Sequence, residues 1–191
     1  MDFSGSDSFD NETFDHTACN EEVEGVSFYK CTFQNVDFQS ARLVDCAFDE
    51  CRFVQCNLSL MEIVGSLFTW VKFTDCKMVG VDWSGTGGFL SASYSGCIMR
   101  NNVFADMNLS QYKFLSCDLR EAQFSNVRLK SAVFDECELG QCQFHQADLS
   151  YANFATSRNY YMNAETNTLK KTVFSLPEAV SLLANLDIVL E

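Results

Sequence analysis

An apolar side chain returns at every fifth position of this chain between residues 26 and 154. A period of five fits neither an α-helix, whose faces repeat every 3.6 residues, nor a plain β-strand, whose faces repeat every two. It is typical of a repeat architecture in which each five-residue unit is one structural element. One residue is inserted near Ser84–Gly88, and the spacing then resumes. The repeated positions are Phe28, Phe33, Phe38, Leu43, Phe48, Phe53, Leu58, Ile63, Phe68, Phe73, Met78 and Trp83, then Phe89, Tyr94, Met99, Phe104, Leu109, Phe114, Leu119, Phe124, Leu129, Phe134, Leu139, Phe144, Leu149 and Phe154.

A small residue usually stands two positions before each repeated one, and the other three positions of a unit are mostly polar. Each unit therefore places one large and one small side chain inward and three toward solvent. A coil of four units would stack residues about twenty apart, and only that spacing gives uniform columns. The aromatic column reads Phe33, Phe53, Phe73, Tyr94, Phe114, Phe134 and Phe154, and a cysteine column reads Cys56, Cys76, Cys97, Cys117 and Cys137. The sequence thus predicts a square coil, whose four walls we number from the units that contain Phe28, Phe33, Phe38 and Leu43.

Three parts are expected along the chain. Residues 1–22 are acidic, and they form either a loose tail or a cap that covers the open first coil with its isolated Phe residues. Residues 23–172 form an all-β solenoid of about 6.5 coils, roughly 31 Å long at ~4.8 Å per coil, with a local bulge at 84–88. Residues 173–191 begin a short C-terminal α-helix, with Ser175 at the N-cap, Pro177 in the first turn and Glu178 three residues after the cap.

Several units, such as Ala41–Asp45, Cys117–Glu121 and Ala147–Tyr151, resemble the pentapeptide-repeat family. The segments Cys56–Leu60 with Phe73–Trp83, and the ending that starts at Phe174, resemble the albicidin-resistance and Qnr-like branch, which protects topoisomerases. The resemblance implies a right-handed quadrilateral β-helix and a non-enzymatic DNA mimic that binds DNA gyrase, with topoisomerase IV as a second candidate. It also implies a homodimer joined at the C-terminal helix. The alternative is a scaffold of the same fold that binds an unrelated regulatory protein.

The composition narrows the range of partners. The net charge of −13 argues against direct binding of nucleic acid, whose phosphates require Lys and Arg. The sequence has no secretory signal and no apolar run that could span a membrane, so a cytoplasmic protein is expected. Most of the ten cysteines occupy small inward positions, where they act as compact apolar filler rather than as metal ligands or disulfides. The two histidines have no recognisable partners, and we expect no catalytic, cofactor or metal site.

Charged residues are unevenly divided among the four walls. Walls one and two are neutral and wall three has a net charge of −1, whereas wall four has five acids against the single base Arg42. These acids are the candidate partner-binding residues: Glu24, Asp45, Glu62, Asp82 and Asp106. An acidic wall of this kind could occupy the basic DNA cleft of a topoisomerase, although chance asymmetry on a solvated face would give the same count.

The C-terminal segment carries the expected dimer contact. Its apolar residues recur at a helical spacing and end in a short predicted strand. The expected interface residues are Phe174, Leu176, Ala179, Leu182, Leu183, Leu186 and Ile188. A helix that only caps its own rod is the alternative. The chain lacks the long loops of quinolone-protecting relatives, which favours protection against an albicidin-type poison.

Overall fold

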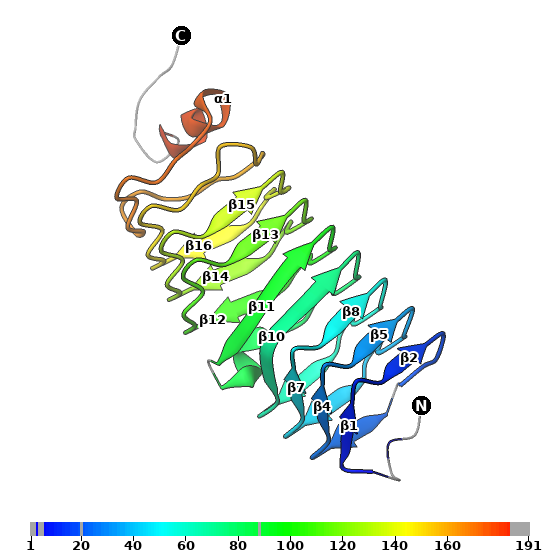
Figure 1. Cartoon of the computed structure of the whole chain (residues 1–191). Helices are drawn as coiled ribbons and strands as arrows, with labels where there is room; N and C mark the ends of the chain where they lie inside the picture. Colours follow the sequence, from blue (N-terminus) through cyan, green and yellow to red (C-terminus); the bar gives the residue numbers. More distant parts are fainter. Residues whose placement is uncertain (1–2, 4–5, 20, 88, 184–191) are drawn as a thin grey trace.

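The chain winds into a rod of about seven stacked coils (Figure 1). The computed structural model describes residues 3, 6–19, 21–87 and 89–183. Residues that pair between neighbouring coils are 20 apart over most of the rod, as in Phe33 with Phe53 and Phe124 with Phe144. The predicted square coil of twenty residues is confirmed. The first strand and the C-terminal helix lie at opposite ends of the rod (Figure 1).

The strands are short, and every pair that they form is parallel. Only β10 and β11 exceed three residues, and β10 spans two walls because it pairs with both β7 and β8. The strands are β1 (Ser8–Asp10), β2 (Thr13–Asp15), β3 (Glu22–Glu24), β4 (Ser27–Tyr29), β5 (Thr32–Gln34), β6 (Arg42–Val44), β7 (Ala47–Asp49), β8 (Arg52–Val54), β9 (Glu62–Val64), β10 (Leu67–Thr74), β11 (Leu90–Ser95), β12 (Val103–Ala105), β13 (Lys113–Leu115), β14 (Gln123–Ser125), β15 (Val133–Asp135) and β16 (Gln143–His145).

The four walls differ in how regular they are. Wall one carries β1, β4, β7 and the starts of β10 and β11, and wall two carries β2, β5, β8, the ends of β10 and β11, β13 and β15. Wall three is joined by single bridges that run from Ala18 to Arg158. Wall four carries β3, β6 and β9, then the 3₁₀ turn η1 (Trp83–Thr86), then β12, β14 and β16.

Stacked aromatic rings fill the interior. The predicted wall-two column is confirmed: ring centroids lie 4.6 Å apart between Phe33 and Phe53 and 5.3 Å apart between Phe73 and Tyr94. The column continues in both directions, because Phe14 stacks on Phe33 and Phe174 stacks on Phe154. Burial of an aromatic side chain contributes about 1.5–3 kcal/mol, so a thin rod can hold a continuous core.

The small inward positions do more than fill space. Buried Cys thiols donate to main-chain carbonyl oxygens of the preceding coil, as Cys51 does to Phe28 at 3.3 Å and Cys56 does to Phe33 at 3.3 Å. Where Ser157 replaces Cys, its hydroxyl makes the same bond at 2.9 Å to the carbonyl of Phe134. A side chain at this position therefore satisfies an inward carbonyl that would otherwise lack a donor. All ten cysteines are buried and free.

The coil that contains the inserted residue departs from the prediction. The expected inward residue Phe89 is 62% exposed, and Leu90 is the buried residue that pairs with Phe68. Ala92 follows Leu90 by two positions, whereas Val71 follows Phe68, the partner of Leu90, by three, so this coil lacks one corner residue. The segment before Leu90, which contains η1, is longer than in the other coils, so the coil as a whole gains one residue. Tyr94 therefore lies opposite Phe73, in the same register as the other coils.

The two ends of the rod are closed in different ways. In the N-terminal segment, β1 and β2 pair with β4 and β5, and Phe3 lies edge-on to the rings of Phe9, Phe14 and Phe28. At the other end, α1 (Leu176–Ala179) continues into η2 (Val180–Leu183). Ser175 is the N-cap residue, but its hydroxyl lies 3.3 Å from the Tyr160 hydroxyl and makes no helix-capping bond.

Candidate partner-binding surface

The five predicted acids all lie on wall four or at its corner, and all are exposed. They come from different elements: Glu24 from β3, Glu62 from β9, and Asp82 from the residue that precedes η1. Asp45 and Asp106 occupy corners, where each has a left-handed backbone conformation with φ of 50° and 57°. The fold therefore places the five side chains on one face of successive coils, in three separate rows.

Arg42 neutralises part of this face. Its guanidinium forms an ion pair with Glu22 in the preceding coil, and its Nε lies 3.5 Å from Glu62 Oε2 in the following one. The strand register places the three side chains in a single row, Glu22, Arg42 and Glu62. Because these groups are about half exposed, the pairs add little to stability. Glu22 thus belongs to the acidic wall, and the sequence missed it because residues 1–22 were treated as a separate segment.

Three of the acids also have local structural tasks. Asp82 accepts bonds from the Ser84 amide at 2.9 Å and the Ser84 hydroxyl at 2.7 Å, and so caps η1. Asp106 accepts a bond from the side chain of Asn126 in the next coil. The Asp45 carboxylate packs against Gly65, and a Cβ added to Gly65 would lie only 2.4 Å from its Oδ1. Glu24 and Glu62 are therefore the acids whose replacement disturbs the backbone least.

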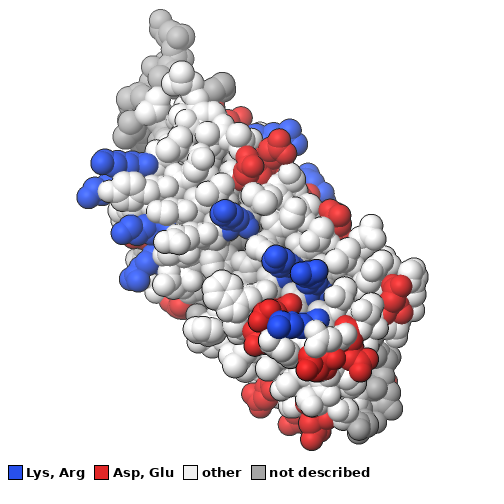
Figure 2. Space-filling model, viewed as in Figure 1, with Lys and Arg blue, Asp and Glu red and all other residues white. Residues whose placement is uncertain are grey.

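The acidic surface covers only part of the rod. Beyond Asp106, the outward strand residues of wall four include no Asp, Glu, Lys or Arg: they are Gln123, Ser125, Gln143 and His145. From β3 to β12 the wall rises by four coils, about 19 Å, and duplex DNA of that length carries about 11 charges. With Glu22 included, the wall has a net charge of −5. Figure 2 shows from another side that Asp and Glu gather toward the β1 end of the rod.

A second charged cluster lies on wall three. The Asp118 carboxylate is held by Arg120, with Nη2 at 2.7 Å, and by Arg100, with Nε at 2.6 Å. The hydrogen bond from Arg120, assisted by Arg100, lowers the pKa of Asp118 to about 2. This cluster is a local ion-pair network that joins neighbouring coils. Within the described residues, no three His, Cys, Asp or Glu side chains are grouped so as to hold a metal ion.

The C-terminal turn presents an apolar face to solvent. Leu176 is 88% exposed, and Val180 and Leu183 follow it at helical spacing with large exposed fractions. Phe174 and Leu182, by contrast, pack against the core of the rod, and Ala179 is half-buried. The sequence missed Val180. The expected contacts of Leu186 and Ile188 lie outside the described residues, and no described helix is long and apolar enough to cross a membrane.

Comparisons with known proteins agree with this architecture. The chain matches no curated protein sequence. Among solved structures it is similar to two trypsin-treated variants of QnrB1, described as a plasmid-mediated fluoroquinolone resistance protein. The TM-scores are 0.62 and 0.56 at 16% and 17% identity, over 96% of this chain and 97% of each of those. HetL from Nostoc sp. strain PCC 7120, described as involved in heterocyst differentiation regulation, has a TM-score of 0.44 at 13% identity, over 91% of this chain and 90% of that one. The family described as "Pentapeptide repeat region" matches residues 26–87 and 88–163, so the chain belongs to the pentapeptide-repeat family.

Proposed function

We propose that this chain is a non-enzymatic protein that binds DNA gyrase as a mimic of duplex DNA and protects it from a gyrase poison. The observation that carries the proposal is the set of exposed acids on wall four, which extends from β3 to β12. DNA-binding clefts are basic, and an acidic rod can compete with DNA for one. Topoisomerase IV is the second target to test.

Shape must supply much of the fit, because the charge of the wall is dilute compared with that of DNA. A rigid rod meets that requirement, since its core is stacked from end to end and its walls follow a regular repeat. Similarity to QnrB1, a fluoroquinolone resistance protein, supports the topoisomerase-directed role at the level of the fold. Among the described residues between 23 and 154, the largest excursion is the short turn η1, and we therefore favour an albicidin-type poison over a quinolone.

We further propose that two rods join at their C-terminal ends. The exposed face of Leu176, Val180 and Leu183 supplies an apolar contact at the end of the rod, and isologous pairs are the commonest oligomers. A joined pair would approach ~65 Å in length at ~4.8 Å per coil. Light scattering at micromolar concentration tests the pair, and a monomeric mass would exclude it.

Supercoiling by purified gyrase, with and without this protein and with and without albicidin or ciprofloxacin, tests the proposed function. We expect the protein to restore supercoiling in the presence of albicidin and to bind gyrase less tightly as the salt concentration rises. The variant Glu24→Lys/Glu62→Lys should lose this effect. Glu121→Lys, an exposed acid on wall three, is the matched control and should retain it.

The outcomes separate the two functions that the sequence left open. No change in any arm would favour a scaffold for an unrelated regulatory protein. Protection against ciprofloxacin alone would support the topoisomerase and reject the choice of poison. Equal activity of Glu24→Lys/Glu62→Lys and Glu121→Lys would reject wall four as the contact surface.

A further inference from the structure

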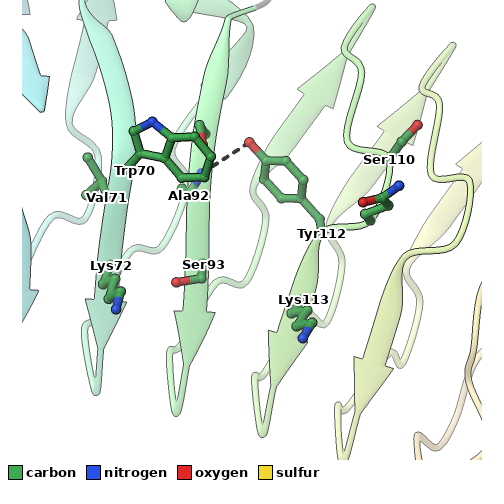
Figure 3. Close-up of a pocket in the computed structure, with 10 residues that line it drawn as sticks. Trp70, Val71, Lys72, Ala92, Ser93, Ser110, Tyr112 and Lys113 are labelled. Carbon is green, nitrogen blue, oxygen red and sulfur yellow. Dashed lines mark hydrogen bonds between the residues drawn. The ribbon is translucent and has the colours of Figure 1, made fainter. Parts of the chain in front are cut away.

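The missing corner in the coil of Leu90 leaves a hollow on the edge between walls one and two. Trp70 on β10 and Tyr112 next to β13 both lean over β11 from opposite sides, and the Tyr112 hydroxyl accepts a bond from the Ala92 amide at 3.3 Å (Figure 3). The same hydroxyl donates to the Leu90 carbonyl. The hollow has a volume of about 410 Å³, and it meets a second of about 390 Å³ at Trp70 and Lys72.

Trp70 stands at the junction of the two hollows and is 71% exposed, the second most exposed of the large apolar side chains in the described part of the chain. At other corners this position holds mostly polar residues or glycine, such as Asn35, Glu50 and Gln55. An exposed Trp in a shallow groove is typical of a binding hot spot. The chain's other tryptophan, Trp83, is fully buried.

Three cations line the same surface. Arg52 and Lys72 are paired in register on β8 and β10, Lys72 is paired with Ser93 on β11, and Lys113 lies one strand further on β13 (Figure 3). Within the described residues none of the three cations takes part in an ion pair, and their row contains no acid. Figure 2 shows Lys and Arg along the middle of this face. We call this surface the Trp70 groove: Arg52, Trp70, Lys72, Ser93, Tyr112 and Lys113.

The only acid that lines the groove is already engaged. Glu50 lies 3.9 Å from the ammonium of Lys30 and 3.5 Å from the hydroxyl of Tyr29, in the preceding coil. The groove therefore offers positive charge beside a bare aromatic ring, on a chain whose net charge is −13. A nucleic acid would bring continuous negative charge against the rest of that chain, whereas a short acidic segment meets only the three cations.

We propose that the Trp70 groove binds an extended acidic segment of a partner protein. An aromatic side chain of the segment packs on the indole of Trp70, and its carboxylates lie against Arg52, Lys72 and Lys113. The cations extend over three coil steps, about 14 Å, which is the length of about four residues in an extended chain. The groove is open along this line, which suits a peptide better than an enclosed small ligand. It lies on the far side of the rod from wall four, so this site does not depend on the proposed function.

A fluorescein-labelled heptapeptide, with a central Phe between two runs of three acidic residues, tests the site by fluorescence anisotropy. We expect saturable binding to the full chain that weakens at least tenfold in Trp70→Ala and in Lys72→Glu/Lys113→Glu. Lys130→Glu, an exposed cation on wall one, is the matched control and should bind as the parent does. Binding should also shift the emission of Trp70, since Trp83 is shielded from solvent.

Each alternative has its own result. If a peptide in which Gln and Asn replace the acids binds as tightly as the acidic peptide, the three cations do not recognise carboxylates, and the proposal is wrong. Tighter binding of an oligothymidylate would assign the groove to single-stranded nucleic acid and reject the proposal, as would no peptide binding up to about 1 mM. Melting curves of the variants guard against misfolding. Lys72→Glu/Lys113→Glu should leave gyrase protection intact, so failure of this site and failure of the proposed function are distinguishable.

Discussion

The indole nitrogen of Trp83 donates to the side-chain oxygen of Asn102 at 2.8 Å, inside the core of the rod. Asn102 occupies a small inward position, and its amide nitrogen donates in turn to the carbonyl oxygens of Met78 and Arg100. The pair joins the irregular coil at η1 to the regular coils that follow it. A buried side chain that completes several hydrogen bonds is costly to remove.

Asn102→Ala should therefore destabilise the rod by about 2–4 kcal/mol, since it leaves the Trp83 donor and the Met78 carbonyl without partners and creates a cavity. Asn102→Cys should cost less, because a thiol at this position can still donate to the carbonyl of the preceding coil. Urea unfolding followed by circular dichroism measures both. A loss of less than about 0.5 kcal/mol in Asn102→Ala would show that the network is dispensable.

Two tyrosine hydroxyls should respond in opposite ways to removal. The hydroxyl of Tyr94 is buried and has no hydrogen-bond partner among the described residues, so Tyr94→Phe should leave stability unchanged or raise it by about 1 kcal/mol. The hydroxyl of Tyr112 serves the main chain of Leu90 and Ala92, so Tyr112→Phe should cost about 1–2 kcal/mol. Thermal melts of the two variants, run in parallel, would contradict this account if their order were reversed.

Glycines at the inserted turn tolerate a methyl group very differently. A Cβ on Gly85 would lie 2.0 Å from the carbonyl oxygen of Ile63, which is main chain and cannot rotate away. Gly85→Ala should cost about 1–3 kcal/mol through overpacking. Gly87 faces open space with φ of +67°, so Gly87→Ala should cost about 1 kcal/mol from backbone strain alone. Denaturant midpoints compare them, and equal losses would count against the close approach of η1 to β9.

Acid should weaken the rod through Asp118. Its pKa in the folded state, about 2, lies below the ordinary value near 3.9, so the ion pairs contribute fully above pH ~4 and are lost as the pH falls toward 2. Asp118→Asn should cost about 1–2 kcal/mol at neutral pH, allowing for solvent screening, and almost nothing near pH 2. Unfolding free energies of both proteins across this range provide the measurement, and a difference independent of pH would exclude the linkage.

The cysteine thiols should not react with thiol-specific reagents in the folded protein. All ten thiols are buried, so a reagent cannot reach them unless the coils open. Burial also raises the pKa of Cys51 to about 12 and raises that of Cys142, and thiolates are the reactive form. We expect a thiol-specific reagent to modify almost none of the ten thiols at neutral pH, and all ten after unfolding in urea. Rapid reaction of two or more thiols in the native state would show that some coils open readily.

The period of five predicted most of the fold. It placed Phe33, Phe53 and Phe73 in one column and Glu62 and Asp82 in the solvent, because burial in a square coil depends only on position within the unit. It failed at Phe89, since a run of glycines lets the chain change register without leaving a hydrophobic signal. Spacing alone could not tell that Leu90 is the inward residue.

The surface was harder to predict than the core. Counting charges wall by wall found Glu24 and Asp106 but dropped Glu22, which pairs with Arg42 only because the N-terminal segment continues the coil. The same count cancelled Lys72 and Lys113 against acids elsewhere on wall two and so concealed the Trp70 groove. An aromatic residue at a corner position was the available signal, and it was not used.

The placement of charge on walls two and four affects how the rod meets other molecules. The cations of the Trp70 groove on wall two and the excess of acids on wall four give the rod a dipole across its short axis. In the field of a charged partner such a rod experiences a torque about its long axis before contact is made. Encounter would therefore begin with the rod already rotated, and the productive orientation would be selected during approach rather than after collision.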